Sequence, residues 1–210
     1  MSFYWVKTNR IIKKLFPQFI WEKKNNAKKV YLTFDDGPTS EITQWTLDQL
    51  KEYNAKATFF CIGSNIAQFL EIFKAVIHEG HTVANHTFNH LNGWKTDTAT
   101  YIENVLLCQK QIGILCENSY LFRPPYGKLK RSQSKKLREL GYQIIMWDVL
   151  SADFDTGISK EKCLQNVLNN VQSGSIIIFH DSVKASKNLK YALPETLQFL
   201  KENDFECHSL

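Results

Sequence analysis

Short apolar runs alternate with longer amphipathic segments along most of this chain. The short runs are rich in Val, Ile and Phe and predict strands, whereas the longer segments have apolar residues three and four positions apart and predict helices. The expected strands are Val30 to Phe34, Ala57 to Cys61, Thr82 to Asn85, Tyr142 to Trp147, and runs near Tyr120, Ser175 and Phe205. The expected helices are Glu41 to Tyr53, Ile66 to Glu79, Thr98 to Ile112, Ser132 to Leu140, Glu161 to Val171 and Leu193 to Glu202. This alternation predicts an α/β fold with a mainly parallel sheet.

Polar residues gather where the expected strands end. Asp35-Asp36-Gly37-Pro38 ends one strand, and His86-Thr87-Phe88-Asn89-His90 follows another. Later strands are followed by Arg123-Pro124-Pro125-Tyr126-Gly127, by the loop Asp148 to Asp155, and by His180. In a strand-helix barrel the carboxyl ends of the strands share one edge, where catalytic residues gather. We therefore expect these five clusters to form one site.

The residue types in these clusters suit metal-assisted hydrolysis. One carboxylate and two imidazoles would hold a divalent ion with a position left open, and the second of Asp35 and Asp36 would serve as a base beside it. On residue types alone the two aspartates are interchangeable. Each cluster also has an ordinary interpretation, because Asp-Gly-Pro is common in turns and many His-x-x-x-His pairs are structural. The carboxylates of the loop Asp148 to Asp155 could simply cap a helix, and His180 could be an ordinary histidine at the end of a strand.

Taken together and in this order, the five clusters resemble the motifs of the polysaccharide deacetylases, metal-dependent carbohydrate esterases with the deacetylase domain first described in nodulation-factor synthesis. The likeness runs from about Lys29 to the C-terminus. It implies a distorted (β/α) barrel with fewer than eight complete units. It also implies a division into a basic amphipathic N-terminal segment, residues 1–28, and a catalytic domain, residues 29–210.

The resemblance implies which residues bind the metal. By that likeness the three ligands are Asp36, His86 and His90, and Thr87 steadies the loop between the two histidines. Two imidazoles and one carboxylate suit Zn²⁺ best, with Co²⁺, Ni²⁺ or Fe²⁺ as alternatives. The chemistry requires no organic cofactor.

The resemblance also implies two proton-transfer groups and an oxyanion donor. Asp35 would be the general base, paired with Arg123, and His180 would be the general acid, oriented by Asp153. The backbone N–H of Tyr126 would help to hold the oxyanion. Opposite charges favour the charged forms, so these pairs would give one base and one acid near neutral pH.

The expected substrate wall departs from the family pattern. It would consist of Trp147, Phe154, Ile178 and Pro125. The family usually has Asp where this chain has Leu150, Trp where it has Phe154, and Leu where it has Ile178. These changes affect the wall of the acetyl pocket and leave the metal and proton-transfer residues intact. They bear on substrate fit rather than on the type of reaction.

The expected activity is removal of N-acetyl groups from an N-acetylglucosamine-containing glycan, with release of acetate. An O-acetyl esterase acting on acetylated polysaccharide is the nearest alternative, because the same groups can hydrolyse both bonds. A catalytically silent glycan-binding domain is an alternative of a different class. Retention of Asp35 and His180 argues against the silent version. Nothing in the sequence predicts an oligomeric state.

The N-terminal segment carries most of the positive charge. Residues 1–29 contain eight Lys or Arg and one acidic residue, Glu22, whereas the whole chain has a net charge of +5. Because the rest of the chain is therefore slightly acidic, nucleic acid is not an expected partner. Apolar residues fall on one helical face of this segment: Trp5, Ile12, Leu15, Phe16 and Phe19. This face would either close the barrel or allow residues 3–21 to make peripheral contact with an anionic membrane.

The location of the protein is predicted from what the N-terminus lacks. Residues 3–21 are interrupted by Lys7, Arg10, Lys13 and Lys14, which is typical neither of a signal peptide nor of a membrane span. The five cysteines are odd in number and lie mostly in apolar runs, which favours reduced core residues. We therefore expect a cytoplasmic protein, or one held peripherally at the inner membrane face.

Overall fold

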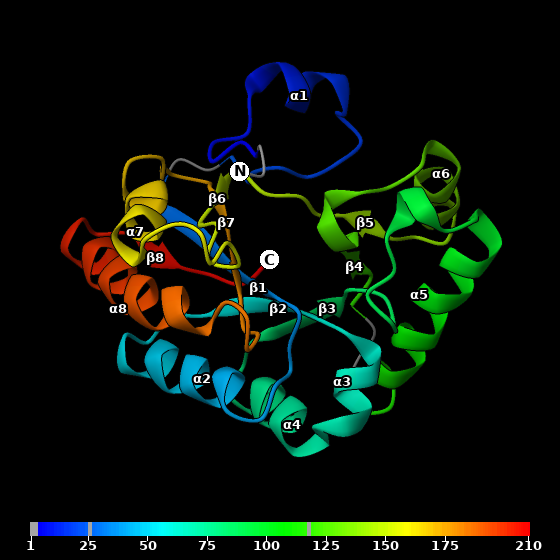
Figure 1. Ribbon diagram of the computed structural model, residues 1–210, viewed down its shortest axis with the longest axis horizontal. Coiled ribbons are helices and arrows are strands. Elements are labelled where there is room, and N and C mark those ends of the chain that lie inside the picture. The colour runs from blue at the N-terminus through cyan, green and yellow to red at the C-terminus, as the bar shows by residue number, and fades with distance from the viewer. Residues whose placement is uncertain (1–3, 25–26, 117–118) are drawn as a thin grey trace.

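Parallel strands form a sheet that curls into an open barrel with helices around its outside (Figure 1). The computed structural model describes residues 4–24, 27–116 and 119–210. Among these residues the strand order is β5-β4-β3-β2-β1-β7-β6, and β8 pairs with the start of β1. The strands are β1 (Lys29–Asp35), β2 (Ala57–Cys61), β3 (Thr82–Asn85), β4 (Leu121–Phe122), β5 (Gln143–Ile144), β6 (Val149–Leu150), β7 (Ile176–His180) and β8 (Glu206–Cys207). The expected distorted barrel is confirmed.

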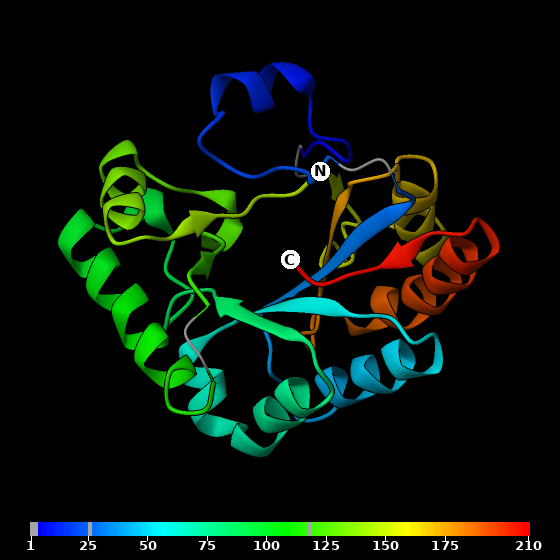
Figure 2. The same ribbon diagram turned by 180° about the vertical axis from the view of Figure 1, so that it is seen from behind.

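The helices that follow β1 in the chain cover the outer face of the sheet, whereas the helix that precedes β1 lies at the open side of the barrel, as both ribbon views show (Figures 1 and 2). They are α1 (Arg10–Leu15), α2 (Ile42–Glu52), α3 (Gly63–Gln68), α4 (Leu70–His78), α5 (Thr98–Ile112), α6 (Arg131–Glu139), α7 (Lys160–Leu168) and α8 (Ser186–Glu202). Two short 3₁₀ turns, η1 (Gly93–Lys95) and η2 (Pro125–Gly127), lie in loops that follow β3 and β4.

Strand β1 shows how one run of sequence builds both the core and the site. Because side chains alternate between the two faces of a strand, Leu32 and Phe34 pack into the main core, whereas Thr33 and Asp35 lie on the other face. The main core continues from β1 through Phe59 and Phe179, whose rings stack on Phe34 at 5.0 and 6.0 Å. The opposite face of β1 is therefore free to carry polar groups into the barrel.

Three sequence predictions of elements need correction. The expected helix Ile66 to Glu79 is two helices, because the backbone of Phe69 leaves the helical region. The last long helix begins earlier, at Ser186, and continues through Pro194 because its buried face packs against the core. The expected strand Tyr142 to Trp147 is shortened to β5, after which the chain crosses to a separate strand, β6.

The N-terminal segment fills the gap in the barrel wall between β5 and β6. Ile20 forms a parallel bridge with Ile145, and Lys7 forms an antiparallel bridge with Val149. Among the described residues of this segment only α1 is helical: Asn9 caps its first turn, and Pro17 follows its end. The single apolar helical face expected from the sequence is therefore not formed, and Ile11 and Leu15 are exposed.

A buried carboxylate attaches this segment to the barrel. Asp148 is fully buried and accepts hydrogen bonds from Lys7 at 2.5 Å, from Lys13 at 2.6 Å and from Ser175 at 2.6 Å. Lys13 also pairs with Glu22 within the segment. Because the hydrogen bonds to the lysines outweigh the effect of burial, which acts in the opposite direction, the pKa of Asp148 is lowered. Among the described residues, no helix has the length and apolar character needed to span a bilayer. The division at residue 28 and the membrane contact stay predictions.

Asp148→Ala should lower the free energy of unfolding by about 3 kcal/mol, the lower end of the range for breaking a buried ion pair, because both lysines are partly exposed. Urea unfolding followed by tryptophan fluorescence measures this change. Glu71→Ala, which removes the exposed ion pair with Lys74, is the matched control and should cost less than about 1 kcal/mol. Equal effects of the two substitutions would contradict attachment through Asp148.

Candidate active site

A fully buried arginine positions the first carboxylate at the end of β1. Nη1 of Arg123 donates to Oδ1 of Asp35 at 2.7 Å and to Oγ1 of Thr33 at 2.8 Å. The rest of the guanidinium donates to the backbone oxygens of Ile145 and Met146, at 3.3 and 3.0 Å. Oδ1 of Asp35 is thus occupied, whereas Oδ2 lies 3.7 Å from Nε2 of His86.

The second carboxylate turns toward the two histidines. Asp36 has a left-handed backbone, with φ of 78°, so its side chain leaves the direction set by β1. Its Oδ1 lies 3.2 Å from Nε2 of His90 and 3.6 Å from Nε2 of His86. The ligand atoms of Asp36, His86 and His90 all lie within 4.8 Å of one another. The structure therefore brings together the three residues expected to bind the metal.

The protonation states of these residues fit a cation. Nδ1 of His86 lies 2.8 Å from the backbone oxygen of Arg123, which leaves Nε2 to face Asp36. Burial lowers the pKa of His86 to about 4, so the ring is neutral at physiological pH. Burial also acts to raise the pKa of Asp36, but its hydrogen bond with His90 and the nearby His180 and His86 outweigh this and hold the pKa well below its usual range. One charged carboxylate and a neutral imidazole with a free nitrogen lone pair form a donor set suited to a divalent metal.

Strained backbone is concentrated in the loops of this site. Among the described residues, seven non-glycine residues have a positive φ, and Asp36, Thr87, His90, Tyr126 and Ala152 belong to the sequence clusters. Such conformations persist only where surrounding contacts impose them. The left-handed residues therefore place side chains where regular strands would not.

His180 and Asp153 form the second charged pair. Nδ1 of His180 lies 2.8 Å from Oδ1 of Asp153, and the backbone N–H of His180 donates to Oδ2 at 2.7 Å. Burial alone would lower the pKa of His180. The charge and hydrogen bond of Asp153, with smaller contributions from Asp36 and Asp35, raise it instead to about 9. Because Nδ1 is occupied, Nε2 is the nitrogen available for proton transfer.

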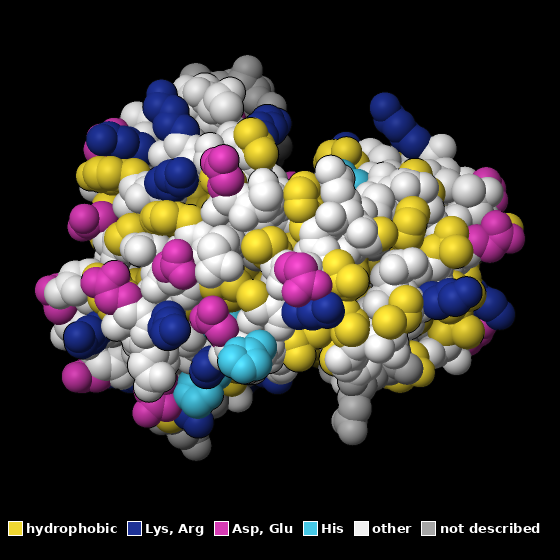
Figure 3. Space-filling model, turned by 90° about the horizontal axis from the view of Figure 1, so that it is seen from below, with side chains coloured by type: hydrophobic (Ala, Val, Ile, Leu, Met, Phe, Trp, Pro, Cys, Tyr) yellow, Lys and Arg dark blue, Asp and Glu magenta, His cyan; other side chains and the backbone are white. Residues whose placement is uncertain are grey.

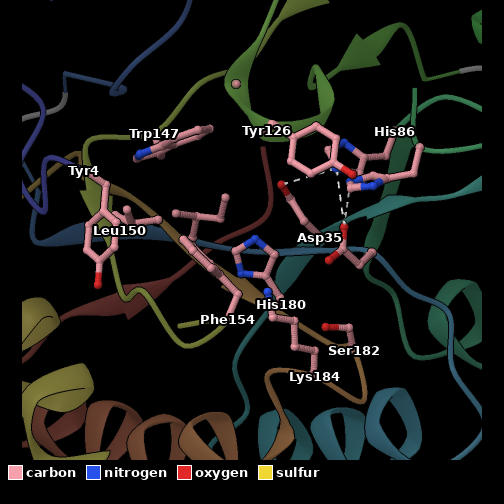
Figure 4. A pocket seen from close by; sticks show the side chains of 14 residues that line it. Tyr4, Asp35, His86, Tyr126, Trp147, Leu150, Phe154, His180, Ser182 and Lys184 are labelled. Carbon is pink, nitrogen blue, oxygen red and sulfur yellow. Dashed lines mark ion pairs between the residues drawn. The ribbon is translucent and has the colours of Figure 1, made fainter. Parts of the chain in front are cut away.

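These groups line one cavity of about 440 Å³. In the close-up, Asp35, Tyr126 and His86 lie on one side of His180, and Trp147, Leu150 and Tyr4 lie on the other (Figure 4). The space-filling view shows a notch between two halves of the molecule, bordered by hydrophobic side chains (Figure 3). Of the residues expected in the substrate wall, three line the cavity: Trp147, Phe154 and Ile178.

Two further expectations concern the turn η2. Pro125, expected in the wall, is buried and does not line the cavity, whose wall at this turn is formed by Tyr126 and Gly127 instead. The ring of Tyr126 lies 4.6 Å from that of His90, centroid to centroid. The backbone N–H of Tyr126 forms no hydrogen bond with another described residue and is available to a ligand.

Several supporting residues were not found from the sequence. Asn104 accepts the backbone N–H groups of Phe88 and Asn89 through its Oδ1, and Asn85 accepts that of Thr87, so these two amides fix the histidine loop. The hydroxyl oxygen of Thr87 accepts a hydrogen bond from the N–H of Leu91 at 3.1 Å. The sequence does contain a signal for Asn104: it lies on the buried face of the amphipathic helix α5, and a buried amide requires a polar partner.

Asp181 supports the aspartate loop in the same way. Its Oδ1 accepts the N–H of Gly37 at 3.1 Å, and its Oδ2 accepts the hydroxyl of Thr43 at 2.6 Å. Burial raises the pKa of Asp181 to about 7. A Cβ at position 37 would lie 2.0 Å from Oδ2 of Asp181, so only glycine fits there. Tyr4, Ser182 and Lys184 also line the cavity without having been expected.

Comparisons with known proteins found a matching family model and similar relatives. The family model described as polysaccharide deacetylase matches residues 22–145. Two peptidoglycan-N-acetylglucosamine deacetylases of Bacillus cereus are 38% and 33% identical, over 75% and 88% of this chain. The aligned region spans 57% of the first relative and 87% of the second. A crystal structure of a peptidoglycan N-acetylglucosamine deacetylase, in complex with a naphthyl N-hydroxybenzamide, is 32% identical, with a TM-score of 0.87 over 92% of this chain and 91% of that one.

The structure separates the expected effects of the two adjacent aspartates on metal binding. Asp36→Ala should reduce metal affinity at least about tenfold, because it removes one of three ligands, whereas Asp35→Asn should keep the metal. Elemental analysis and calorimetric titration of purified protein measure the two effects. Should Asp35→Asn lose the ion while Asp36→Ala retains it, the assignment of the two carboxylates is reversed.

Proposed function

Because the chain belongs to the polysaccharide deacetylase family, we propose that it is a metal-dependent hydrolase that removes N-acetyl groups from an N-acetylglucosamine-containing glycan. The observation that carries this proposal is the placement of two proton-transfer pairs, Asp35 with Arg123 and His180 with Asp153, beside Asp36, His86 and His90 in one cavity. Amide hydrolysis needs a base for the attacking water and an acid for the leaving nitrogen.

We assign the metal site to Asp36, His86 and His90, and we propose Zn²⁺ as the ion, because a carboxylate and two imidazoles suit zinc. A bound divalent ion would polarise the acetyl carbonyl and acidify a water molecule. The orientation of His86 is set by the backbone oxygen of Arg123, so the ligand geometry and the base share one support. Such outer partners commonly tune metal affinity.

Asp35 is proposed as the general base. Arg123 occupies its Oδ1, so Oδ2 is the oxygen that accepts the proton as water adds to the amide carbon. The same guanidinium is anchored by backbone oxygens, so the carboxylate is held in one orientation before substrate arrives. Preorganisation of this kind saves the cost of ordering the base during the reaction.

His180 is proposed as the general acid. Nε2 gives its proton to the amide nitrogen as the C–N bond of the tetrahedral intermediate breaks, which releases the amine and leaves acetate. Asp153 holds the ring and its charge. The backbone N–H of Tyr126 is proposed as a donor to the oxyanion, in agreement with its lack of a hydrogen bond to the described residues.

The purified protein should release acetate from an N-acetylated glycan and lose this activity on chelation. Asp35→Asn should lower kcat about a hundredfold or more, the usual scale for a general base, and Asp48→Asn, at an exposed carboxylate, is the control. Acetate is measured with glucosamine oligomers, peptidoglycan fragments and acetylated xylan. Release from xylan alone would favour the O-acetyl esterase, and no release from any glycan would favour a silent binding domain.

The acid role of His180 predicts the alkaline limb of the pH profile. The raised pKa keeps the ring protonated at neutral pH, so the rate should be full below the pKa and fall as pH rises toward 9. Asp153→Asn removes the main cause of the shift and should move this limb toward lower pH, in the direction of the ordinary value of 6.5. Profiles of kcat/KM for both proteins, with metal content checked, measure this. An unmoved limb would contradict the role of His180.

A further inference from the structure

The N-terminal segment contributes a side chain to the catalytic cavity. Tyr4 lines it together with Trp147, Leu150, Phe154 and Ile178. Tyr4 also packs against the small apolar cluster that contains Leu150 and Ile178. In the close-up, Tyr4 lies at the end of the cavity far from His86, and Phe154 and His180 lie between them (Figure 4). A residue remote in sequence from every other wall residue thus forms one end of the site.

Contacts on two sides hold the ring of Tyr4 in place. Its hydroxyl donates to Oδ2 of Asp155 at 2.9 Å. Its ring meets Phe154 edge-on, with centroids 5.9 Å apart, and Phe154 meets His180 edge-on at 5.0 Å. Burial and the neighbouring Asp155 carboxylate raise the pKa of Tyr4 to about 12, so the phenol remains a neutral donor. A row of three rings therefore connects Tyr4 with the proposed general acid.

The backbone that carries Tyr4 is attached to the same stretch of chain that carries the wall. The N–H of Leu150 donates to the backbone oxygen of Val6 at 2.8 Å. Thr8 donates from its N–H to the oxygen of Asp148 at 2.9 Å and from its hydroxyl to the oxygen of Trp147 at 2.8 Å. The position of Tyr4 relative to Trp147 and Leu150 is therefore fixed by main-chain contacts.

The chemistry of the cavity differs between its two ends. In the close-up, Asp35 and His86 lie on one side of His180, whereas Leu150 and the rings of Tyr4 and Trp147 lie on the other (Figure 4). The amide must lie between Asp35 and His180 for both proton transfers. Leu150, Ile178 and Phe154 offer no side-chain hydrogen-bonding groups, so a sugar ring packed against them would lose part of the hydration of its hydroxyl groups. The part of the substrate that fits this end is the acyl chain.

We propose that Tyr4 closes the acyl end of the cavity and limits the length of the N-acyl group that the enzyme accepts. This inference rests on the proposed deacetylase function and extends it to substrate specificity. The side chain acts by occupying space beside Leu150 and Phe154, so its truncation lengthens the acyl site and leaves the proton-transfer pairs unchanged. Longer N-acyl groups, such as propionyl and butyryl, would then fit.

The test compares acyl preference across variants. The glycan that yields acetate is chemically deacetylated and re-acylated with acetyl, propionyl or butyryl groups, and release of each acid is measured. Wild-type protein should prefer acetyl. Tyr4→Ala should lower the ratio of kcat/KM for acetyl to that for butyryl by about tenfold or more, a typical effect of a few methylenes in an apolar pocket. Tyr4→Phe should keep the wild-type ratio because the ring remains.

Tyr53→Ala is the matched control. Tyr53 lies outside the cavity and also donates its hydroxyl to another side chain, Oε1 of Gln198, at 3.3 Å, so its loss should leave the ratio unchanged. Thermal unfolding verifies that each variant is folded, and Tyr4→Leu, which is shorter but apolar, carries the test should Tyr4→Ala not fold. A folded, active Tyr4→Ala or Tyr4→Leu with the wild-type ratio would overturn the inference. Failure of the wild-type protein to release any acid would instead overturn the proposed function, and the inference with it.

Discussion

The buried guanidinium of Arg123 is the interaction on which the site depends. A charge with no exposure to water is tolerated only if its N–H groups have acceptors, and here these come from β1 and from the chain that follows β5. The guanidinium also lies 4.0 Å from the ring of Phe60 in β2. The backbone oxygen of Arg123 lies 2.8 Å from Nδ1 of His86. One residue thus connects the proposed base, a proposed metal ligand and the curled wall of the barrel.

The open side of the barrel imposes a second constraint. Strands β5 and β6 do not pair, so the backbone groups between them need other partners, and the N-terminal segment supplies these through Val6, Thr8 and Ile20. The stretch that it covers includes the two carbonyl groups that accept from Arg123. A segment outside the motif-bearing part of the chain therefore stabilises the region that positions the base. The segment is attached by ion pairs as well as by main-chain hydrogen bonds, because the buried Asp148 pairs with Lys7 and Lys13.

The site also depends on strained loops held by buried side-chain oxygens. Left-handed backbone at Asp36, Thr87 and His90 turns three neighbouring side chains away from the directions of β1 and β3. Asn85, Asn104 and Asp181 compensate by accepting the backbone N–H groups of these loops. The strain and the hydrogen bonds that oppose it lie in the same few residues, which is typical of preorganised sites.

The sequence by itself determined the alternation of strands and helices and the set of polar clusters. Both depend on local periodicity and on turn chemistry, which are properties of short windows. The relative positions of residues far apart in the sequence could not be predicted from such windows. The different directions of Asp35 and Asp36, the burial of Pro125, and the helix that continues through Pro194 were decided by packing between distant parts of the chain. The same holds for Tyr4, which enters the cavity because Asp148 and the unpaired edges of β5 and β6 bind the N-terminal segment, and no pattern near residue 4 records those partners.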